Sequence, residues 1–270
     1  MKNHWKSILR SLQGVLVLLR LVKIEFLKMK RRAFFLLATL AAMILPIPIS
    51  LLTARTGQGY DFLYKTVINV GHCILLIPVL GIVSTILFFE ERDNGTLKNI
   101  LCVPVERNRI LRAKLIVLLI ISLAYSIISY LATLVGAFVG DMPVEHFFSK
   151  LGVCVAMGGM TWVATLPCVA MVIAFNKNYI ASTLVSFIYA ILGFIITNVS
   201  ITQPVPNIFM ILPVNVITRW LLPYFEQLNT ANYPFDINLS SVSTLVCTVY
   251  LVICILIFDK LIRKFFDKWN

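Results

Sequence analysis

Long uninterrupted apolar runs constrain this chain more than any other feature of its sequence. The runs lie at residues 33–53, 66–89, 115–139, 151–175, 179–199 and 239–258. A helix needs roughly 20 apolar residues to cross the hydrocarbon core of a bilayer. Because lipid offers the backbone no hydrogen-bond partners, a spanning segment is either a helix or part of a closed barrel. These runs lack the alternation of barrel strands, so we predict an all-α integral membrane protein with six transmembrane helices.

The amino-acid composition agrees with a membrane protein. Hydrophobic residues make up 59% of the chain and charged residues 13%, whereas soluble domains are about 45–50% apolar and about 25% charged. The formal net charge of +12 would suit nucleic-acid binding, but the charges lie beside the apolar runs, so we expect no nucleic-acid partner. Residues 1–32 are basic throughout and lack a small-residue cleavage site, so we expect no cleaved signal peptide.

The distribution of Lys and Arg predicts how the chain is oriented. Residues 1–32, residues 90–114, the link 176–178 and the tail 259–270 together carry twenty, and the opposite side carries four. Cytoplasmic segments of membrane proteins are enriched in Lys and Arg. We therefore predict cytoplasmic termini, a transmembrane domain over residues 33–258 and a cytoplasmic tail from residue 259.

Residues 1–32 have the pattern of an amphipathic helix. One face carries apolar side chains at helical spacing: Trp5, Ile8, Leu9, Leu12, Val15, Leu16, Leu19 and Val22. Lys6, Arg10 and Arg20 lie on the other face, and Arg31 and Arg32 stand just before the first span. This pattern favours a helix lying at the inner membrane surface, where anionic lipid attracts its cationic face. A helix that packs on a soluble partner would show the same pattern.

Proline interrupts the apolar stretch between the last two spans. Residues 200–238 contain Pro204, Pro206, Pro213, Pro223 and Pro234. Proline lacks the backbone N–H that a helix interior needs, so this stretch cannot form one straight span. We predict short, broken helices that dip into the membrane or lie on its outer face. An ordinary extracellular loop is the alternative.

The spans lack the groups that usually drive transport or catalysis. His72 is the only titratable histidine, acid or basic residue clearly inside one, and we predict that it packs against neighbouring helices or lies at the interface. Carboxylates inside the membrane usually mark ion-coupled carriers, and a phosphate-binding loop has a G-x-x-x-x-G-K-[ST] pattern. The sequence shows neither pattern, nor a metal-ligand cluster. We therefore expect the energy for any transport to come from another subunit.

Small residues predict where helices approach closely. Gly136 and Gly140 form one small-xxx-small pair in the third run, and Gly152 and Ala156 form another in the fourth. Such pairs let two helix backbones come together inside a membrane.

Residues 90–114 form the most densely charged segment between two runs. Asp93 or Asn94 is suited to cap a short helix, in which Leu97, Ile100 and Leu101 have amphipathic spacing, and Pro104 ends it. A second helix, starting near Val105, would continue into the third span. The segment therefore predicts a short amphipathic helix exposed on the cytoplasmic side, although its charges could also serve only to anchor the membrane interface.

The same segment resembles the cytoplasmic loop of type-2 ABC exporter permeases. The matching residues are Glu90, Glu91, Gly95, Thr96, Leu97, Leu101, Pro104, Arg107, Ile110 and Lys114. The N-terminal helix, the number of spans and the broken segment before the last span are also similar, so the resemblance covers essentially the whole chain. It implies that residues 90–114 hold a coupling helix that fits a cleft in a separate cytoplasmic ATPase subunit.

The resemblance also implies an assembly and a location. Two ATPase subunits, which bind ATP and Mg, would work with two permeases, the second identical or homologous to this chain. This chain would then be a multi-pass protein of the bacterial cell membrane, in contact with lipid, with no cofactor and no catalytic activity of its own. Its size and its Leu-x-x-Pro-x-x-Arg pattern are most similar to permeases of bacteriocin, lantibiotic or bacitracin self-protection exporters.

These observations predict a permease that expels an antimicrobial peptide, an antibiotic or another amphipathic or lipid-like substrate. Two other functions stay open at this point. The segment 90–114 could recruit a different cytoplasmic partner to a membrane scaffold or sensor. An intramembrane enzyme or ion-coupled carrier would require polar groups that the spans do not show.

Overall fold

The computed structural model describes residues 14, 16–28, 40–57, 59–93, 107–174, 179–226 and 240–267, and every regular element within them is helical. The elements are α3 (Pro46–Thr56), α4 (Tyr60–Val70), η1 (Gly71–Leu76), α5 (Ile77–Asp93), α7 (Arg107–Val139), α8 (Phe147–Ala174), α9 (Tyr179–Ser200), η2 (Ile208–Ile211), α10 (Pro213–Glu226) and α12 (Thr244–Asp267). A further helix covers residues 16–28 and is called the N-terminal helix below. The predicted all-α fold class is confirmed.

Five of the described helices are long and apolar enough to cross a membrane. They cover Tyr60–Phe89, Arg107–Val139, Phe147–Ala174, Tyr179–Ser200 and Thr244–Asp267. The first predicted span, residues 33–53, corresponds to a shorter apolar helix, Leu40–Thr56, and residues 33–39 lie outside the described part of the chain. The protein is therefore a helical integral membrane protein.

Several helices extend beyond the apolar runs that predicted them. The third apolar run begins at residue 115, but α7 begins at Arg107 and continues without a break to Val139. This agrees with the helix that was predicted to start near Val105 and to continue into the third span. Most of the predicted tail, residues 259–270, continues α12 as far as Asp267. The charged residues that flank the apolar runs of α7 and α12 are therefore helical too.

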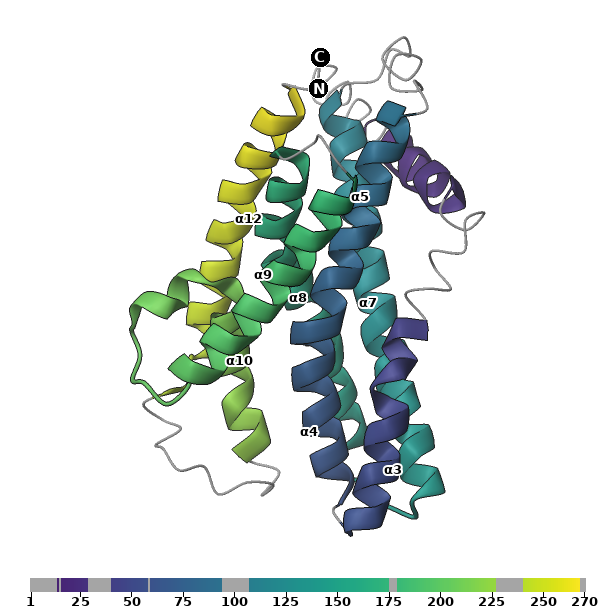
Figure 1. Cartoon of the computed structure of the whole chain (residues 1–270), viewed down its shortest axis with the longest axis vertical. Helices are drawn as coiled ribbons and strands as arrows, with labels where there is room; N and C mark the ends of the chain where they lie inside the picture. The colour runs from purple at the N-terminus through teal and green to yellow at the C-terminus, as the bar shows by residue number, and fades with distance from the viewer. Residues whose placement is uncertain are drawn as a thin grey trace, which may run out of the picture.

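The long helices run side by side along the longest axis of the molecule (Figure 1). One end of this bundle, here the loop end, is where α5 ends and α7 begins. At the opposite end, here the turn end, α3 is joined to α4 and α7 to α8. Gly57 caps α3 with a φ of 67°, in the left-handed region that favours glycine. The N-terminal helix, drawn in purple, lies at the loop end (Figure 1).

Three glycines let helices approach closely. A Cβ on Gly81 would lie 2.4 Å from Cβ of Ser186 in α9, and one on Gly158 would lie 3.0 Å from Cβ of Ser126 in α7. A Cβ on Gly136 of α7 would lie 2.5 Å from Cβ of Ser50 in α3. Side chains on these glycines would push the helices apart.

The two predicted small-residue pairs differ in outcome. Gly136 and Gly140 both face α3, where Gly140 approaches Ala54, so close approach at this pair is confirmed. A Cβ on Gly152 would meet nothing within 4 Å, so the pair Gly152 and Ala156 does not mark a close approach among the described residues. Gly158 is the residue of α8 that serves this purpose.

A turn of π-helix interrupts the rod formed by α4 and α5. Residues Gly71–Leu76 form this turn, η1, in the middle of the helix Tyr60–Phe89. His72 is fully buried there, and its Nε2 lies 2.9 Å from Oγ of Ser126 on α7. The predicted packing of His72 between helices is confirmed. Such π-helical turns inside α-helices are frequent at functional sites.

The proline-containing segment folds back against the bundle. Its described part consists of turns, the short η2 and α10, in agreement with the predicted broken helices. The α10 helix packs against α8, α9 and α12, and its Thr218 Oγ1 lies 3.8 Å from Sγ of Cys73 in η1. The segment therefore reaches the middle of the Tyr60–Phe89 helix.

Candidate functional site

The described residues of the predicted coupling element lie at the loop end. Glu90 and Glu91 lie in the last turn of α5, and Arg107 is the first residue of α7. Five of the predicted coupling residues, Gly95, Thr96, Leu97, Leu101 and Pro104, lie outside the described part of the chain. The ends of α5 and α7 therefore flank the segment 94–106.

Lys114 lies inside the bundle. Its side chain is fully buried in the second turn of α7. The Nζ atom donates a hydrogen bond to the backbone oxygen of Leu87 on α5, at 2.6 Å. It also forms an ion pair with Oε2 of Glu25, at 3.4 Å. Lys114 therefore faces neighbouring helices of its own chain.

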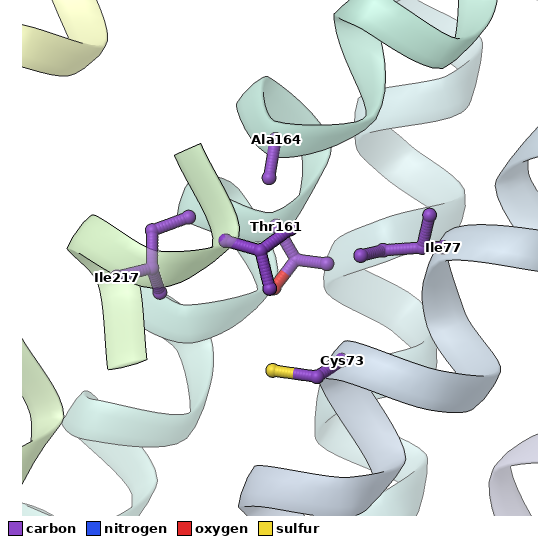
Figure 2. A pocket seen from close by; sticks show the side chains of 6 residues that line it. Cys73, Ile77, Thr161, Ala164 and Ile217 are labelled. Carbon is purple, nitrogen blue, oxygen red and sulfur yellow. The ribbon is translucent and has the colours of Figure 1, made fainter. Parts of the chain in front are cut away.

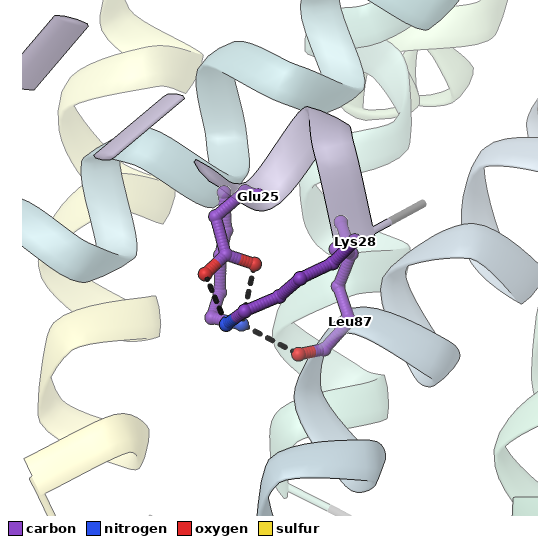
Figure 3. A network of polar contacts seen from close by, with 4 residues as sticks. Glu25, Lys28 and Leu87 are labelled. Atoms are coloured by element: carbon purple, nitrogen blue, oxygen red, sulfur yellow. Dashed lines mark hydrogen bonds and ion pairs between the residues drawn. The ribbon is translucent and has the colours of Figure 1, made fainter. Parts of the chain in front are cut away.

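Glu25 brings the N-terminal helix to this point. Only 6% of the residue is exposed, and its Oε1 accepts a second hydrogen bond from Nζ of Lys28 at 2.9 Å. Figure 3 shows Glu25 and Lys28 of the N-terminal helix directed toward each other, beside the backbone oxygen of Leu87. The polar contacts thus join the N-terminal helix to both α5 and α7.

The N-terminal helix is only partly described. Trp5, Leu12, Arg31 and Arg32, which the sequence assigned to the membrane surface, lie outside the described residues. Leu19 is 59% exposed. Further exposed apolar side chains on this helix are Leu16, Ile24 and Leu27. The helix therefore turns Glu25 toward the bundle and apolar side chains away from it.

Aromatic contacts connect the loop end to two more helices. The Nζ atom of Lys114 lies 5.5 Å from the centre of the Phe88 ring, which meets the Phe266 ring of α12 edge-on with 6.0 Å between centres. The next residue, Phe89, meets the ring of Tyr179 at the start of α9. Movement at the loop end would therefore reach α9 and α12 through packed rings.

A second buried lysine lies at the turn end. Lys150, at the start of α8, is 3% exposed and its Nζ lies 2.5 Å from Oδ1 of Asp61 on α4. The same Nζ lies 4.8 Å from the centre of the Tyr60 ring and 5.9 Å from that of Tyr64. The hydroxyl of Tyr64 donates to the backbone oxygen of Lys150 at 2.7 Å. This cluster joins α4 to α8.

Arg219 organises the proline-containing segment. Its side chain is fully buried. It donates hydrogen bonds to four oxygen atoms, the side-chain oxygen of Asn215 and the backbone oxygens of Ser200, Gln203 and Ser240. Guanidinium stays protonated in proteins and has five N–H donors in a fixed plane. One cation therefore holds together the end of α9, the turn after it, α10 and Ser240, which precedes α12.

A narrow gap lies where η1, α5, α8 and α10 meet. The gap is too narrow to hold a water molecule. The lining side chains are Cys73, Ile77, Thr161, Ala164, Val214 and Ile217. Figure 2 shows side chains from all these elements directed toward the same space. The folded-back segment and the bundle therefore pack incompletely at this point.

The sequence analysis did not predict the buried contacts of four residues in these clusters: Glu25, Asp61, Lys150 and Arg219. A signal existed for Glu25, since it is the only acidic residue among residues 1–32. Arg219 is the only Lys or Arg among residues 200–238, a stretch that is otherwise mostly apolar and rich in proline. The pairing of Asp61 with Lys150 had no signal, because residues that far apart meet only through the fold.

The clusters are suited to holding helices together. Each buried charge described above contacts a group of opposite charge or several backbone oxygens, as buried charges require. Among the described residues, no group of three or more histidine, cysteine or acidic side chains could bind a metal ion. The arrangement therefore supports helices that move as connected bodies.

Comparison with known proteins adds an independent finding. The sequence profile of a family described as "ABC-2 family transporter protein" matches residues 21–193. The chain is also 26% identical, over 134 residues, to a protein of Bacillus licheniformis named bacitracin transport permease protein BCRB. That alignment covers 46% of this chain and 62% of the relative, so the chain spans less than two thirds of the relative's length.

Proposed function

The chain belongs to the ABC-2 transporter family, in which it is a permease, and we propose that it exports an antimicrobial peptide, an antibiotic or another amphipathic or lipid-like substrate. As an ABC-2 permease it is a non-catalytic transmembrane subunit, and the nucleotide is bound by an ABC ATPase partner. The similarity to a protein named as a bacitracin transport permease supports an antimicrobial substrate.

The proposed entry point for mechanical work is the segment between α5 and α7. We propose that residues 94–106 and the adjoining Glu90, Glu91 and Arg107 contact the ATPase subunit. The observation that supports this most is the continuous α7, which begins at Arg107 and crosses the whole bundle to Val139. A push on its first residue would be carried along a rigid helix.

The proposed assembly contains two permeases and two ATPase subunits. We propose six transmembrane helices, with Leu40–Thr56 as part of the first, and with both termini and the loop end in the cytoplasm. In this orientation the N-terminal helix would lie at the inner membrane surface, where its exposed apolar side chains Leu16, Leu19, Ile24 and Leu27 would meet lipid. The second permease would be identical or homologous.

One experiment tests the coupling role directly. The permease is purified with its co-expressed ATPase subunit, and ATP hydrolysis is measured in liposomes with and without bacitracin. We expect a stable complex in which Gly95→Pro, Glu91→Lys or Arg107→Glu abolishes bacitracin-stimulated hydrolysis. Arg55→Glu, a charge reversal near the turn end, is the matched control and should leave stimulation intact.

Two results would contradict the proposal. A permease that purifies without any ATPase subunit would contradict the assembly. Stimulation that persists in all three loop variants would contradict the role of the loop. Susceptibility of a deletion strain to bacitracin and to cationic antimicrobial peptides then identifies the substrate, and unchanged susceptibility to all of them would contradict an antimicrobial cargo.

A further inference from the structure

Lys114 joins three parts of the loop end that are separate in the sequence. It belongs to α7, its Nζ atom donates to Leu87 of α5, and it pairs with Glu25 of the N-terminal helix. Leu87 precedes the segment 94–106 and Lys114 follows it. One ammonium group therefore holds the N-terminal helix against both helices that carry this segment.

Burial makes the pair interdependent. Lys114 is fully buried and Glu25 is 6% exposed. When one member of a buried ion pair is removed, the other becomes an uncompensated buried charge. The second partner of Glu25 differs, because the side chain of Lys28 is 46% exposed and contributes little by comparison. The contact that matters is thus the one between Glu25 and Lys114.

The contact also lies on a path into the bundle. Beneath the Lys114 ammonium, the Phe88 ring meets Phe266 near the end of α12. A displacement of the α5 and α7 ends would therefore move the N-terminal helix and α12 together, provided that Lys114 keeps its contacts.

We propose that Glu25 and Lys114 are positioning residues for coupling. They fasten the N-terminal helix to the ends of α5 and α7, so that movement of residues 94–106 is passed to this helix and not only to the spanning helices. The proposal rests on the coupling role proposed for that segment. It also gives Lys114 a role inside the permease in place of direct contact with the ATPase.

The first measurement reports the link itself. Spin labels are placed at Leu19→Cys on the N-terminal helix and at Asn108→Cys at the start of α7, in a Cys102→Ser background. Both sites are exposed, and the five cysteines other than Cys102 are buried. In the complex we expect a single narrow distribution of distances between the two spin labels, which nucleotide binding does not change. Glu25→Gln should broaden this distance, and the control Lys28→Gln should not.

The second measurement reports coupling. In the complex with the ATPase subunit, Glu25→Gln should lower bacitracin-stimulated ATP hydrolysis about tenfold, in the range of coupling effects seen along such contacts. Lys28→Gln should lower it less than about twofold, since the Lys28 side chain is 46% exposed and water screens its charge.

A double variant separates positioning from stability. Glu25→Gln with Lys114→Met removes both buried charges and leaves neither of them without its partner, so the thermal unfolding midpoint should return close to that of the parent. Coupling should stay about tenfold lower, because the link is still missing. Recovery of coupling together with the unfolding midpoint would show a merely structural role and overturn the proposal.

The remaining outcomes are also decisive. A narrow label distance and parental hydrolysis in Glu25→Gln would overturn the inference while leaving the proposed function intact. If the parent complex itself fails to couple hydrolysis to bacitracin, the proposed function fails. The distance between the two spin labels then decides the inference. A narrow distance distribution in Glu25→Gln overturns it. A broad distribution shows that Glu25 links the N-terminal helix to α7.

Discussion

At the scale of single residues, this protein depends on a few buried cations whose partners come from distant parts of the chain. Lys114, Lys150 and Arg219 are each at most 3% exposed. A buried charge is tolerated only when it is paired or fully hydrogen-bonded. Each of them therefore fixes the positions of several helices at once.

Arg219 provides the first residue-scale prediction. Arg219→Lys should lower the free energy of unfolding by about 2–4 kcal/mol. One ammonium group cannot reach all four oxygens that the guanidinium group contacts, so the oxygens that it does not reach stay buried without a hydrogen-bond donor. The measurement is SDS-induced unfolding in mixed micelles. Arg263→Lys is the control, since Arg263 pairs with Asp259 one turn away in the same helix and both side chains are partly exposed. Equal losses in the two variants would contradict the interpretation.

The cluster of Asp61, Lys150, Tyr60 and Tyr64 at the turn end provides the second residue-scale prediction. Asp61→Ala should destabilise by about 2 kcal/mol because it leaves the Lys150 ammonium unpaired, with the loss reduced by the partial exposure of Asp61. Lys150→Met should cost less, since methionine can still pack on the rings of Tyr60 and Tyr64. In the double variant we expect a loss smaller than the sum by about 1–2 kcal/mol. Additive losses, measured in the same micelles, would mean that the two residues do not interact.

At the scale of helices, small side chains set the distances between helix axes. The buried face of α9 consists only of small residues: Ser182, Ser186, Ala190, Gly193, Thr197 and Ser200. Ser186 lies against Gly81 of α5, so two backbones approach where both helices lack bulk. Inside a membrane, association of this kind relies on close van der Waals packing.

Gly158 and Gly159 test this packing within one helix. A Cβ on Gly158 would lie 3.0 Å from Cβ of Ser126 and 3.2 Å from the backbone oxygen of Ser122, whereas one on Gly159 would meet nothing within 4 Å. Gly158→Ala should therefore lower the thermal unfolding midpoint in detergent. Gly159→Ala should leave it unchanged or raise it, since alanine favours helix over glycine by about 1 kcal/mol. Similar shifts in both variants would show that α7 and α8 do not pack as described.

At the scale of the whole molecule, the helices differ in how much of them the bundle covers. The most apolar window of Tyr60–Phe89 is 78% buried, whereas those of Tyr179–Ser200 and Thr244–Asp267 are 28% and 22% buried. The helix Tyr60–Phe89 is thus central, and α9 and α12 present most of their apolar surface outward. The folded-back α10 fills the space between α8, α9 and α12.

The orientation of the whole molecule gives the last prediction. In a Cys102→Ser background, Glu145→Cys at the turn end should react with a membrane-impermeant maleimide added to intact cells. Asn108→Cys at the loop end should react only after the membrane is permeabilised, because the side with most Lys and Arg is predicted to face the cytoplasm. Both positions are exposed, so the reverse labelling pattern would contradict the predicted orientation.

The sequence by itself was sufficient for the features that depend on local chemistry. Apolar runs predicted the all-α membrane fold, prolines predicted the broken segment around α10, and the pattern over residues 90–114 identified the family. These features follow from backbone hydrogen bonding in lipid and from short-range spacing, which can be read along the chain.

Only the tertiary structure decided which charges are buried and with what they pair. Lys114 is part of the loop pattern in the sequence, yet in the fold it contacts Glu25, 89 positions away. Lys150 and Asp61 are equally far apart in the chain. Arg219 is one of the four Lys and Arg residues on the predicted outer side. The fold surrounds it with oxygens from α9, the turn after it, α10 and Ser240. Partners of this kind are set by how helices pack, and no local pattern records that packing.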